Sequence, residues 1–239
     1  MTLTSHKPAP SHCSLLHAFI RHDLTTAVGR VRRALSKEQL AYVARQHYAM
    51  PDSAACHNAL QLVRQSSPEF LLNHCLRSYA FAVAMAHKTK QKIDQEVLFL
   101  GAVMHDLGLT EHCHSEETFE VAGARAAREL CLQHNLSHSR ADLVHEMVAL
   151  HNSVGIADKK DAEIALLHFG AGADVAGLWL NDIHPQTLHE VLNDYPRLEF
   201  KEGMIKLLNE QISAKPHSYM APMIRLGFLK KIRQAPFSS

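Results

Sequence analysis

The sequence predicts an all-α fold, arranged as a single-domain helical bundle. Apolar residues recur with helical spacing along most of the chain, and no segment alternates apolar and polar residues for long enough to require a sheet. The 239 residues contain no internal repeat and no low-complexity linker. One domain with a sizeable core is therefore expected.

Prolines, glycines and capping residues set the expected limits of the helices. Residues 1–14 are polar and are expected to be loose, and residues 15–50 should form one or two N-terminal helices that pack on the core. Pro68 suits the first turn of a helix, whereas Asp94 can cap another helix that stops at Gly108. The helices expected beyond residue 50 cover residues 53–66, 68–88, 95–107, 119–134, 138–152 and 161–179, with two or three more over 186–233.

Composition argues against several classes of protein. The formal net charge of +1 provides no global field for nucleic acid or an anionic membrane, and the longest apolar runs, 79–86 and 97–104, are too short to span a bilayer. The five cysteines are odd in number and include no C-x-x-C pair, which argues against a disulfide framework or a zinc ribbon. The N-terminal sequence lacks the features of a signal peptide, so a cytoplasmic location is expected.

Three segments place potential metal ligands inside stretches that otherwise have the character of buried helices. They are LLNHCLRSYAFA with His74, LFLGAVMHDLGL with His105 and Asp106, and IALLHFGAGADVAGLW with Asp174. A polar side chain in an apolar helix is costly unless something pairs it, and one metal ion would pair all four. Together these side chains suggest a metal site.

Each candidate ligand also has a structural interpretation. Nineteen histidines and ten aspartates give about 0.8 His-Asp dipeptides by chance, and the chain contains two, His22-Asp23 and His105-Asp106. Only His105-Asp106 is flanked by apolar residues, so His22-Asp23 is assigned to a surface helix. His74 alone could be a buried histidine bonded to a backbone carbonyl. Asp174 needs either a cation or a hydrogen-bond network from elsewhere in the chain.

The ordered set of motifs resembles the HD-domain superfamily of metal-dependent hydrolases. The segments NHCLRSYAFA, EVLFLGAVMHDLGL, FEVAGARAAREL, ALHNSVGIA and GAGADVAG are similar to its cyanamide hydratase-like branch. The resemblance implies an HD metal-binding domain over residues 51–215, in which one divalent transition metal ion is bound by His74, His105, Asp106 and Asp174. Imidazole and carboxylate ligands suit Zn, Fe, Mn, Co or Ni, with Zn or Fe favoured.

Five polar residues near these motifs are candidates for catalytic or substrate-contacting roles: Asn73, Arg77, Glu120, His151 and Asn152. His151 is the candidate for proton transfer or for binding a second ion, and packing is its alternative. Arg77 is expected to form a structural salt bridge with Asp106 or Glu120. Glu120 could accept a hydrogen bond or carry a proton, or simply favour the first turn of its helix. At Asn152 the family commonly has threonine.

The resemblance implies addition of water to a small nitrile-like molecule, most like the hydration of cyanamide to urea. One alternative is an HD-type phosphohydrolase that acts on a nucleotide or another phosphoester. A third hypothesis is an HD protein that binds a metal or ligand without turnover. The expected partner is a small-molecule substrate rather than nucleic acid or a membrane, and a homo-oligomer is compatible with the sequence.

Two polar or basic segments are expected to face solvent. Residues 109–117, LTEHCHSEE, are predicted to be a solvated loop, and the alternative is a lid that touches substrate. The C-terminal helix and tail, residues 216–239, contain the basic stretch RLGFLKKIR and are predicted to be a solvated amphipathic helix.

Overall fold

A computed structural model describes residues 40–238 of the protein. The predictions for residues 1–14, for most of 15–50 and for His22-Asp23 lie outside the described residues. Within residues 40–238 the chain forms ten α-helices and no strand, which confirms the prediction of an all-α fold. None of the helices in this range combines the length and the apolar character needed to cross a lipid bilayer.

The helices begin and end within a few residues of their predicted limits. Asp94 caps its helix as predicted, because its carboxylate accepts a hydrogen bond from the backbone N–H of Val97 at 3.2 Å. The α-helices are α2 (Ala54–Ser66), α3 (Glu69–Thr89), α4 (Gln95–Met104), α5 (Phe119–Gln133), α6 (His138–Leu150), α7 (Ala162–Ala176), α8 (Pro185–Asp194), α9 (Phe200–Ala214), α10 (Met220–Arg225) and α11 (Phe228–Gln234). Short 3-10 turns are η1 (Arg45–Tyr48), η2 (Leu107–Leu109), η3 (Glu111–Cys113), η4 (Ala157–Lys159) and η5 (Leu180–Asp182).

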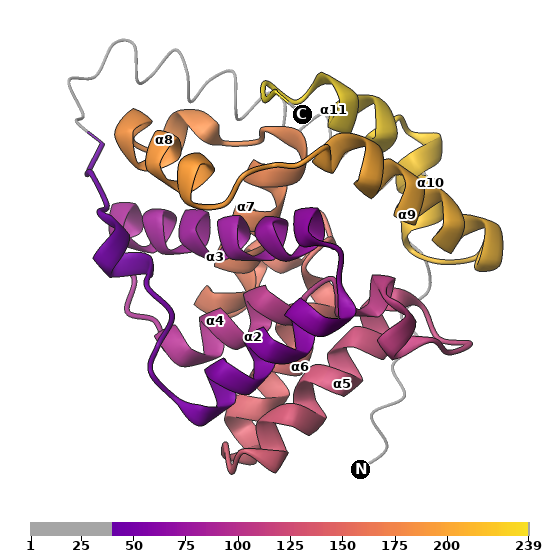
Figure 1. Ribbon diagram of the computed structural model, residues 1–239, viewed down its shortest axis with the longest axis horizontal. Helices are drawn as coiled ribbons and strands as arrows, with labels where there is room; N and C mark the ends of the chain where they lie inside the picture. Colours follow the sequence, from indigo (N-terminus) through magenta and orange to yellow (C-terminus); the bar gives the residue numbers. More distant parts are fainter. Residues whose placement is uncertain (1–39, 239) are drawn as a thin grey trace.

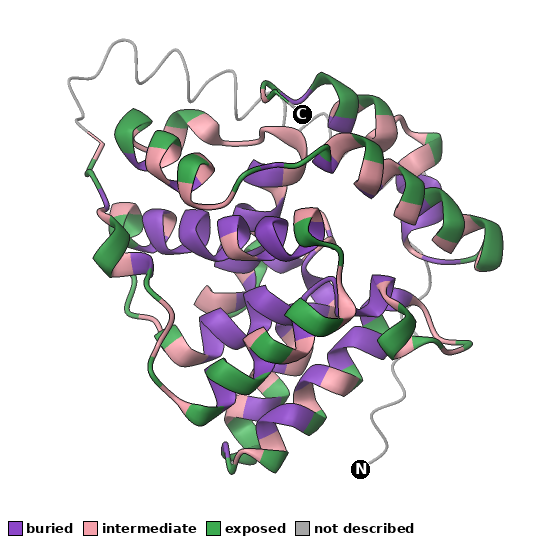
Figure 2. Cartoon of the chain, in the orientation of Figure 1, coloured by how far each residue is buried: buried purple, intermediate pink, exposed green. Residues whose placement is uncertain are grey.

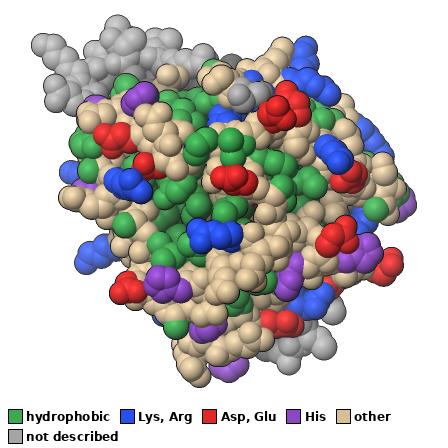
Figure 3. All heavy atoms as spheres, viewed as in Figure 1, with side chains coloured by type: hydrophobic (Ala, Val, Ile, Leu, Met, Phe, Trp, Pro, Cys, Tyr) green, Lys and Arg blue, Asp and Glu red, His purple; other side chains and the backbone are tan. Residues whose placement is uncertain are grey.

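Helix α3 runs across the middle of the molecule. Helices α2, α4, α5 and α6 lie below it in Figure 1, and α8 to α11 lie above it. Helix α4 is buried along its length from Val97 to Met104, and Figure 2 shows buried residues concentrated around it and along α3. Acidic and basic side chains are interspersed on the face seen in Figure 3, as expected from the near-neutral net charge.

The C-terminal helices belong to a second, smaller apolar core. Its buried members are Leu71, Leu109, Phe119, Phe200, Met204, Leu208, Met220, Met223 and Ile232. Helix α11 has the amphipathic character predicted for the C-terminal segment: Ile232 is fully buried, while Lys230 and Arg233 face solvent. The sequence shows that such a short helix has an apolar face, but it does not show which surface covers that face.

Helices α3 and α7 approach so closely that one position on α7 requires glycine. A Cβ atom at Gly170 would overlap the backbone carbonyl of Ser78 on α3. The close approach brings Asp174, one turn further along α7, within hydrogen-bond distance of His74 on α3. The packing of two helices thus determines the first contact of the candidate site.

Gly170→Ala is expected to lower the free energy of unfolding by about 1–3 kcal/mol, because the backbone of α3 must move to admit a methyl group. Gly101→Ala on α4 is the matched control: its Cβ atom would meet mainly the flexible end of Met147, which can rotate away. Urea unfolding of both variants measures the difference. Equal losses would contradict the close approach of α3 and α7.

Candidate metal centre

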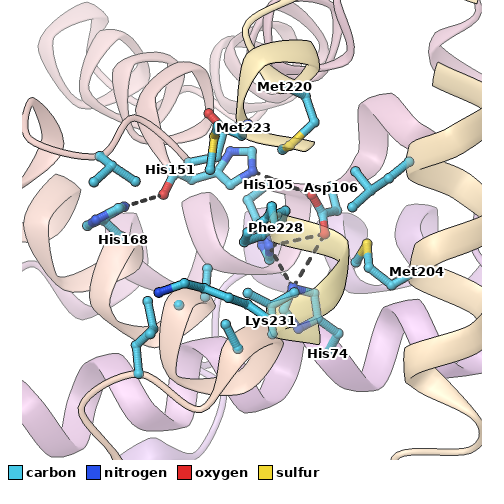
Figure 4. A pocket seen from close by; sticks show the side chains of 18 residues that line it. His74, His105, Asp106, His151, His168, Met204, Met220, Met223, Phe228 and Lys231 are labelled. Carbon is cyan, nitrogen blue, oxygen red and sulfur yellow. Dashed lines mark hydrogen bonds and ion pairs between the residues drawn. The ribbon is translucent and has the colours of Figure 1, made fainter. Parts of the chain in front are cut away.

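Three buried side chains bring one donor atom each to a common point between α3 and the end of α4. The Nε2 atoms of His74 and His105 lie 3.2 Å apart, and Oδ2 of Asp106 lies 3.4 Å from the first and 3.3 Å from the second (Figure 4). Donors bound at about 2.1 Å to one transition metal ion are separated by about 3.0–3.4 Å in octahedral or tetrahedral geometry. This triangle of donors therefore fits a single ion.

Both histidines hold their other ring nitrogen in a hydrogen bond that fixes the tautomer. Nδ1 of His74 donates to Asp174, and Nδ1 of His105 donates to the carbonyl of Ala102, each at 2.7 Å. With Nδ1 as the protonated nitrogen, Nε2 of each ring is the nitrogen whose lone pair can bind an ion. Two nitrogen lone pairs at 3.2 Å repel one another unless a cation or a proton lies between them. The donor set is thus arranged as a metal site requires.

Helix C-termini supply two of the imidazoles around the site. His105 is the C-cap of α4, and His151 is the C-cap of α6. Each ring bonds through Nδ1 to the carbonyl three residues earlier, Ala102 or Val148, at 2.7 Å. Carbonyls in the last turn have no intrahelical donor, so these imidazoles satisfy them and are held rigid at the same time.

Asp174 lies outside the triangle of three donors, and its role as a fourth ligand stays a prediction. Its Oδ2 atom accepts the hydrogen bond from His74 Nδ1, the nitrogen remote from the triangle. Arg77 donates to both carboxylate oxygens, at 2.7 and 2.9 Å, and Arg197 donates to Oδ1 at 2.8 Å. The cations that pair with the Asp174 carboxylate are therefore Arg77 and Arg197. The sequence indicates a buried carboxylate but not which cation lies beside it.

Asp174 is ionised in this setting. Burial acts to raise the pKa of its carboxyl, but the charge of Arg77, the hydrogen bonds from His74 and Arg77, and the charge of Arg197 outweigh burial. The pKa of Asp174 therefore lies far below its usual value. An ionised carboxylate on Nδ1 strengthens the imidazole of His74 as a donor through Nε2.

Asn73 and Arg77 do not line the cavity, so the structure does not place them against substrate. Arg77 donates to the carbonyls of Tyr195 and Pro196 at 2.8 and 3.1 Å in addition to Asp174. Asn73 donates to the carbonyl of Pro196 at 2.9 Å. Arg77 forms a buried salt bridge, as predicted. Its partner, however, is Asp174 rather than Asp106 or Glu120. Both side chains hold the segment that precedes α9.

The three donors face a cavity of about 70 Å³. Helices α6 and α7 and the end of α4 form one part of its wall, and the C-terminal helices form another with Met204, Leu208, Met220, Met223, Phe228 and Lys231. Most of the wall is apolar. The only Asp, Glu, Lys or Arg side chains among the described lining residues are Asp106 and Lys231.

His151 lies beside the donors and lines the same cavity. Its Nε2 atom is 3.5 Å from Oδ1 of Asp106, the oxygen not counted among the three donors. Burial, reinforced by neighbouring His105, lowers the pKa of His151 to about 4, so its ring is neutral near pH 7. A neutral ring with Nε2 toward the site can accept a proton or bind an ion.

Asn152 lines the cavity, whereas Glu120 lies behind it. The amide Nδ2 of Asn152 donates to Oε1 of Glu120 at 2.7 Å. Burial raises the pKa of Glu120. Neither Oε2 of Glu120 nor Oδ1 of Asn152 has a hydrogen-bond partner among the described residues. Glu120 therefore fixes the orientation of the Asn152 amide and does not itself face the cavity.

Several wall residues escaped the sequence analysis. The methionines and Phe228 carry no polar signal that distinguishes them from ordinary core residues. His168 was detectable in principle, because it lies in the same kind of apolar helical segment that singled out His74; its Nδ1 atom donates to the carbonyl of His151 at 2.7 Å. Residues 109–117, considered as a lid, contribute no side chain to the cavity, and His112 in this segment is exposed.

Residues 71–186 match the family model of the HD domain, a span that contains all three donors. This part of the chain is an HD domain. This match confirms the predicted superfamily of metal-dependent enzymes. HD-domain proteins bind divalent metal ions, and the triangle of donors could hold such an ion.

The chain is also similar to two curated proteins of Saccharomyces cerevisiae (strain ATCC 204508 / S288c), the cyanamide hydratases DDI2 and DDI3. Each is 24% identical over 172 residues, which cover 68% of this chain and 76% of the relative. This similarity agrees with the predicted branch of the superfamily.

Asp106→Ala is expected to abolish binding of a divalent ion, because it removes one of the three donors. Asp174→Asn is expected to retain the ion with about 10–100-fold lower affinity, since the amide orients His74 less firmly. Chelator competition and elemental analysis after dialysis measure both effects, with melting curves to verify folding. Complete loss of the ion from folded Asp174→Asn would show that Asp174 is a ligand, as the sequence predicts.

Glu120→Gln is expected to change how stability depends on pH. The folded-state pKa of Glu120 is raised above its unfolded value of about 4.3, so its contribution to stability is full below that pH and is lost as the pH rises through the folded-state pKa. The variant should therefore gain stability relative to the wild type as the pH rises above about 4.3. Urea unfolding at several pH values measures this difference, and a difference independent of pH would contradict the buried carboxyl.

Proposed function

We propose that the protein is a metal-dependent enzyme that adds water to a small nitrile-type molecule, with hydration of cyanamide to urea as the model reaction. The observation that carries the proposal is the triangle of His74, His105 and Asp106 facing a small, mostly apolar cavity. The similarity to two cyanamide hydratases supports it. When bound, a divalent ion at these donors would act as a Lewis acid and lower the pKa of water. Two imidazoles and a carboxylate suit zinc or iron.

The size of the cavity favours a very small substrate. One water molecule needs about 10–15 Å³ of such space, so about 70 Å³ admits a molecule of a few non-hydrogen atoms together with water. Cyanamide meets this requirement, whereas a nucleotide is far too large. Met204, Met220 and Met223 occupy the space that a larger substrate would need.

The charges around the cavity favour a neutral substrate over a phosphoester. Phosphoryl transfer relies on several cationic groups around the phosphate. Of the lysines and arginines in residues 40–238, only Lys231 lines the cavity. Arg77 and Arg197 are engaged with Asp174 on the far side of His74. A nitrile, which carries no charge, avoids the requirement for further cations.

Hydration can be assigned to side chains at the cavity wall. The reaction forms one carbon–oxygen bond, removes one π bond of the carbon–nitrogen triple bond and moves one proton from water to nitrogen; tautomerisation then gives the amide, or urea from cyanamide. His151 is the proposed proton carrier, since it lines the cavity and its Nε2 atom faces the donors, 3.5 Å from Oδ1 of Asp106; from there it can take the proton from water and pass it to nitrogen. Asn152 is the proposed hydrogen-bond donor to the developing anionic nitrogen through its second N–H.

Purified protein loaded with Zn²⁺ or Fe²⁺ is expected to form urea from cyanamide, and a chelator should abolish the activity. His151→Ala should keep the ion bound while lowering kcat by about 10²–10⁴-fold, because the proton carrier is lost. His112→Ala, an exposed histidine outside the cavity, is the matched control and should match the wild type. Metal content and a urea assay provide the two measurements.

The outcomes of this experiment separate the alternatives. Loss of one metal equivalent in His151→Ala would indicate a second ion bound through His151. Turnover of a phosphoester in place of cyanamide would identify a phosphohydrolase. Metal binding without turnover of either substrate would favour a protein that binds a ligand without catalysis.

A further inference from the structure

The guanidinium of Arg197 lies between two aromatic rings. Its Cζ atom is 4.6 Å from the ring centroid of Phe200 and 4.3 Å from that of Phe237. Nη1 donates to Asp174, whereas the buried Nε and Nη2 atoms have no hydrogen-bond partner among the described residues. The two ring faces therefore provide much of the stabilisation that water would otherwise give to this charge.

The segment that carries Phe237 is held by two helices. Lys201 on α9 donates through Nζ to the carbonyls of Ala235 and Phe237, at 2.9 and 2.7 Å. Pro236 packs against Gly177 at the end of α7 so closely that a Cβ atom at Gly177 would overlap its ring. The end of the chain is thus fastened close to Asp174, which lies in the last turn of α7.

The contacts of Arg197 lead directly to a candidate metal ligand. Arg197 donates to Asp174 Oδ1, and Asp174 Oδ2 accepts from His74 Nδ1. Phe200, on the other face of Arg197, also packs on the ring of His74 with centroids 4.8 Å apart. The position of the Arg197 guanidinium therefore affects both contacts that orient this ligand.

We propose that Phe237, near the C-terminus, is a positioning residue for the metal centre and acts through Arg197 and Asp174 on His74. Its ring keeps water away from the outer face of the Arg197 guanidinium. Without the ring, water can hydrate Nε and Nη2, and the ion pair with Asp174 weakens in the more polar surroundings. The carboxylate then holds His74 less firmly. This inference rests on the proposed metal site, but not on any particular reaction.

The test compares metal affinity among variants of the full-length protein. Phe237→Ala is expected to weaken Zn²⁺ binding about tenfold in chelator competition. Phe237→Trp, which retains an aromatic face, should remain close to the wild type, and Phe237→Leu, which retains apolar bulk only, should fall between them. Ser238→Ala is the matched control and should leave the affinity unchanged. Melting temperatures verify that each variant is folded.

A double-mutant cycle distinguishes positioning from simple anchoring of the tail. In an Arg197→Met background, Phe237→Ala should weaken Zn²⁺ binding no further, because its route to His74 is gone. Additive losses, or Phe237→Leu equal to the wild type, would overturn the inference. So would a fall in melting temperature of Phe237→Ala with no change in affinity. A wild-type protein that binds no Zn²⁺ would instead overturn the proposed function, and this inference with it.

Discussion

The ion pair between Asp174 and Arg77 is the contact on which the rest of the site depends. Both groups are fully buried, and removal of Asp174 would leave the charge of Arg77 uncompensated in the core. The pair joins α7 to α3, and Arg197 adds the segment before α9 to the same cluster. His74 is oriented by a carboxylate that is already fixed in place. The helix packing that stabilises the fold thus also orients a candidate metal ligand.

The backbone complements these side chains. Helices α4 and α6 both end at the site, in His105 and His151. The C-terminus of a helix carries a partial negative charge, which favours a cation nearby. Two helix termini therefore add to the charge of Asp106 in favouring a cation. Among the described residues that line the cavity, no carboxylate other than that of Asp106 contributes to this effect.

The sequence predicted the parts of this structure that depend on local patterns. Helical spacing, Pro68 and Asp94 gave helix limits to within a few residues, and buried polar positions singled out His74, His105 and Asp106. Arg197 was not found, because its importance arises from a contact with Asp174 on a different element. The sequence pattern identifies a group that needs a partner. Only the packing of distant segments decides which partner it receives.

The same distinction applies to substrate selection. The HD match ends at residue 186, whereas the methionines, Phe228 and Lys231 that narrow the cavity all lie beyond residue 200. The donors and their supporting hydrogen bonds therefore arise largely within the matched family region, but much of the cavity wall does not. Two HD domains with the same donors can thus accept substrates of different size if their C-terminal helices differ. In this protein those helices form a mostly apolar part of the cavity wall, and in the proposed function this wall, more than the donor set, limits the size of the substrate.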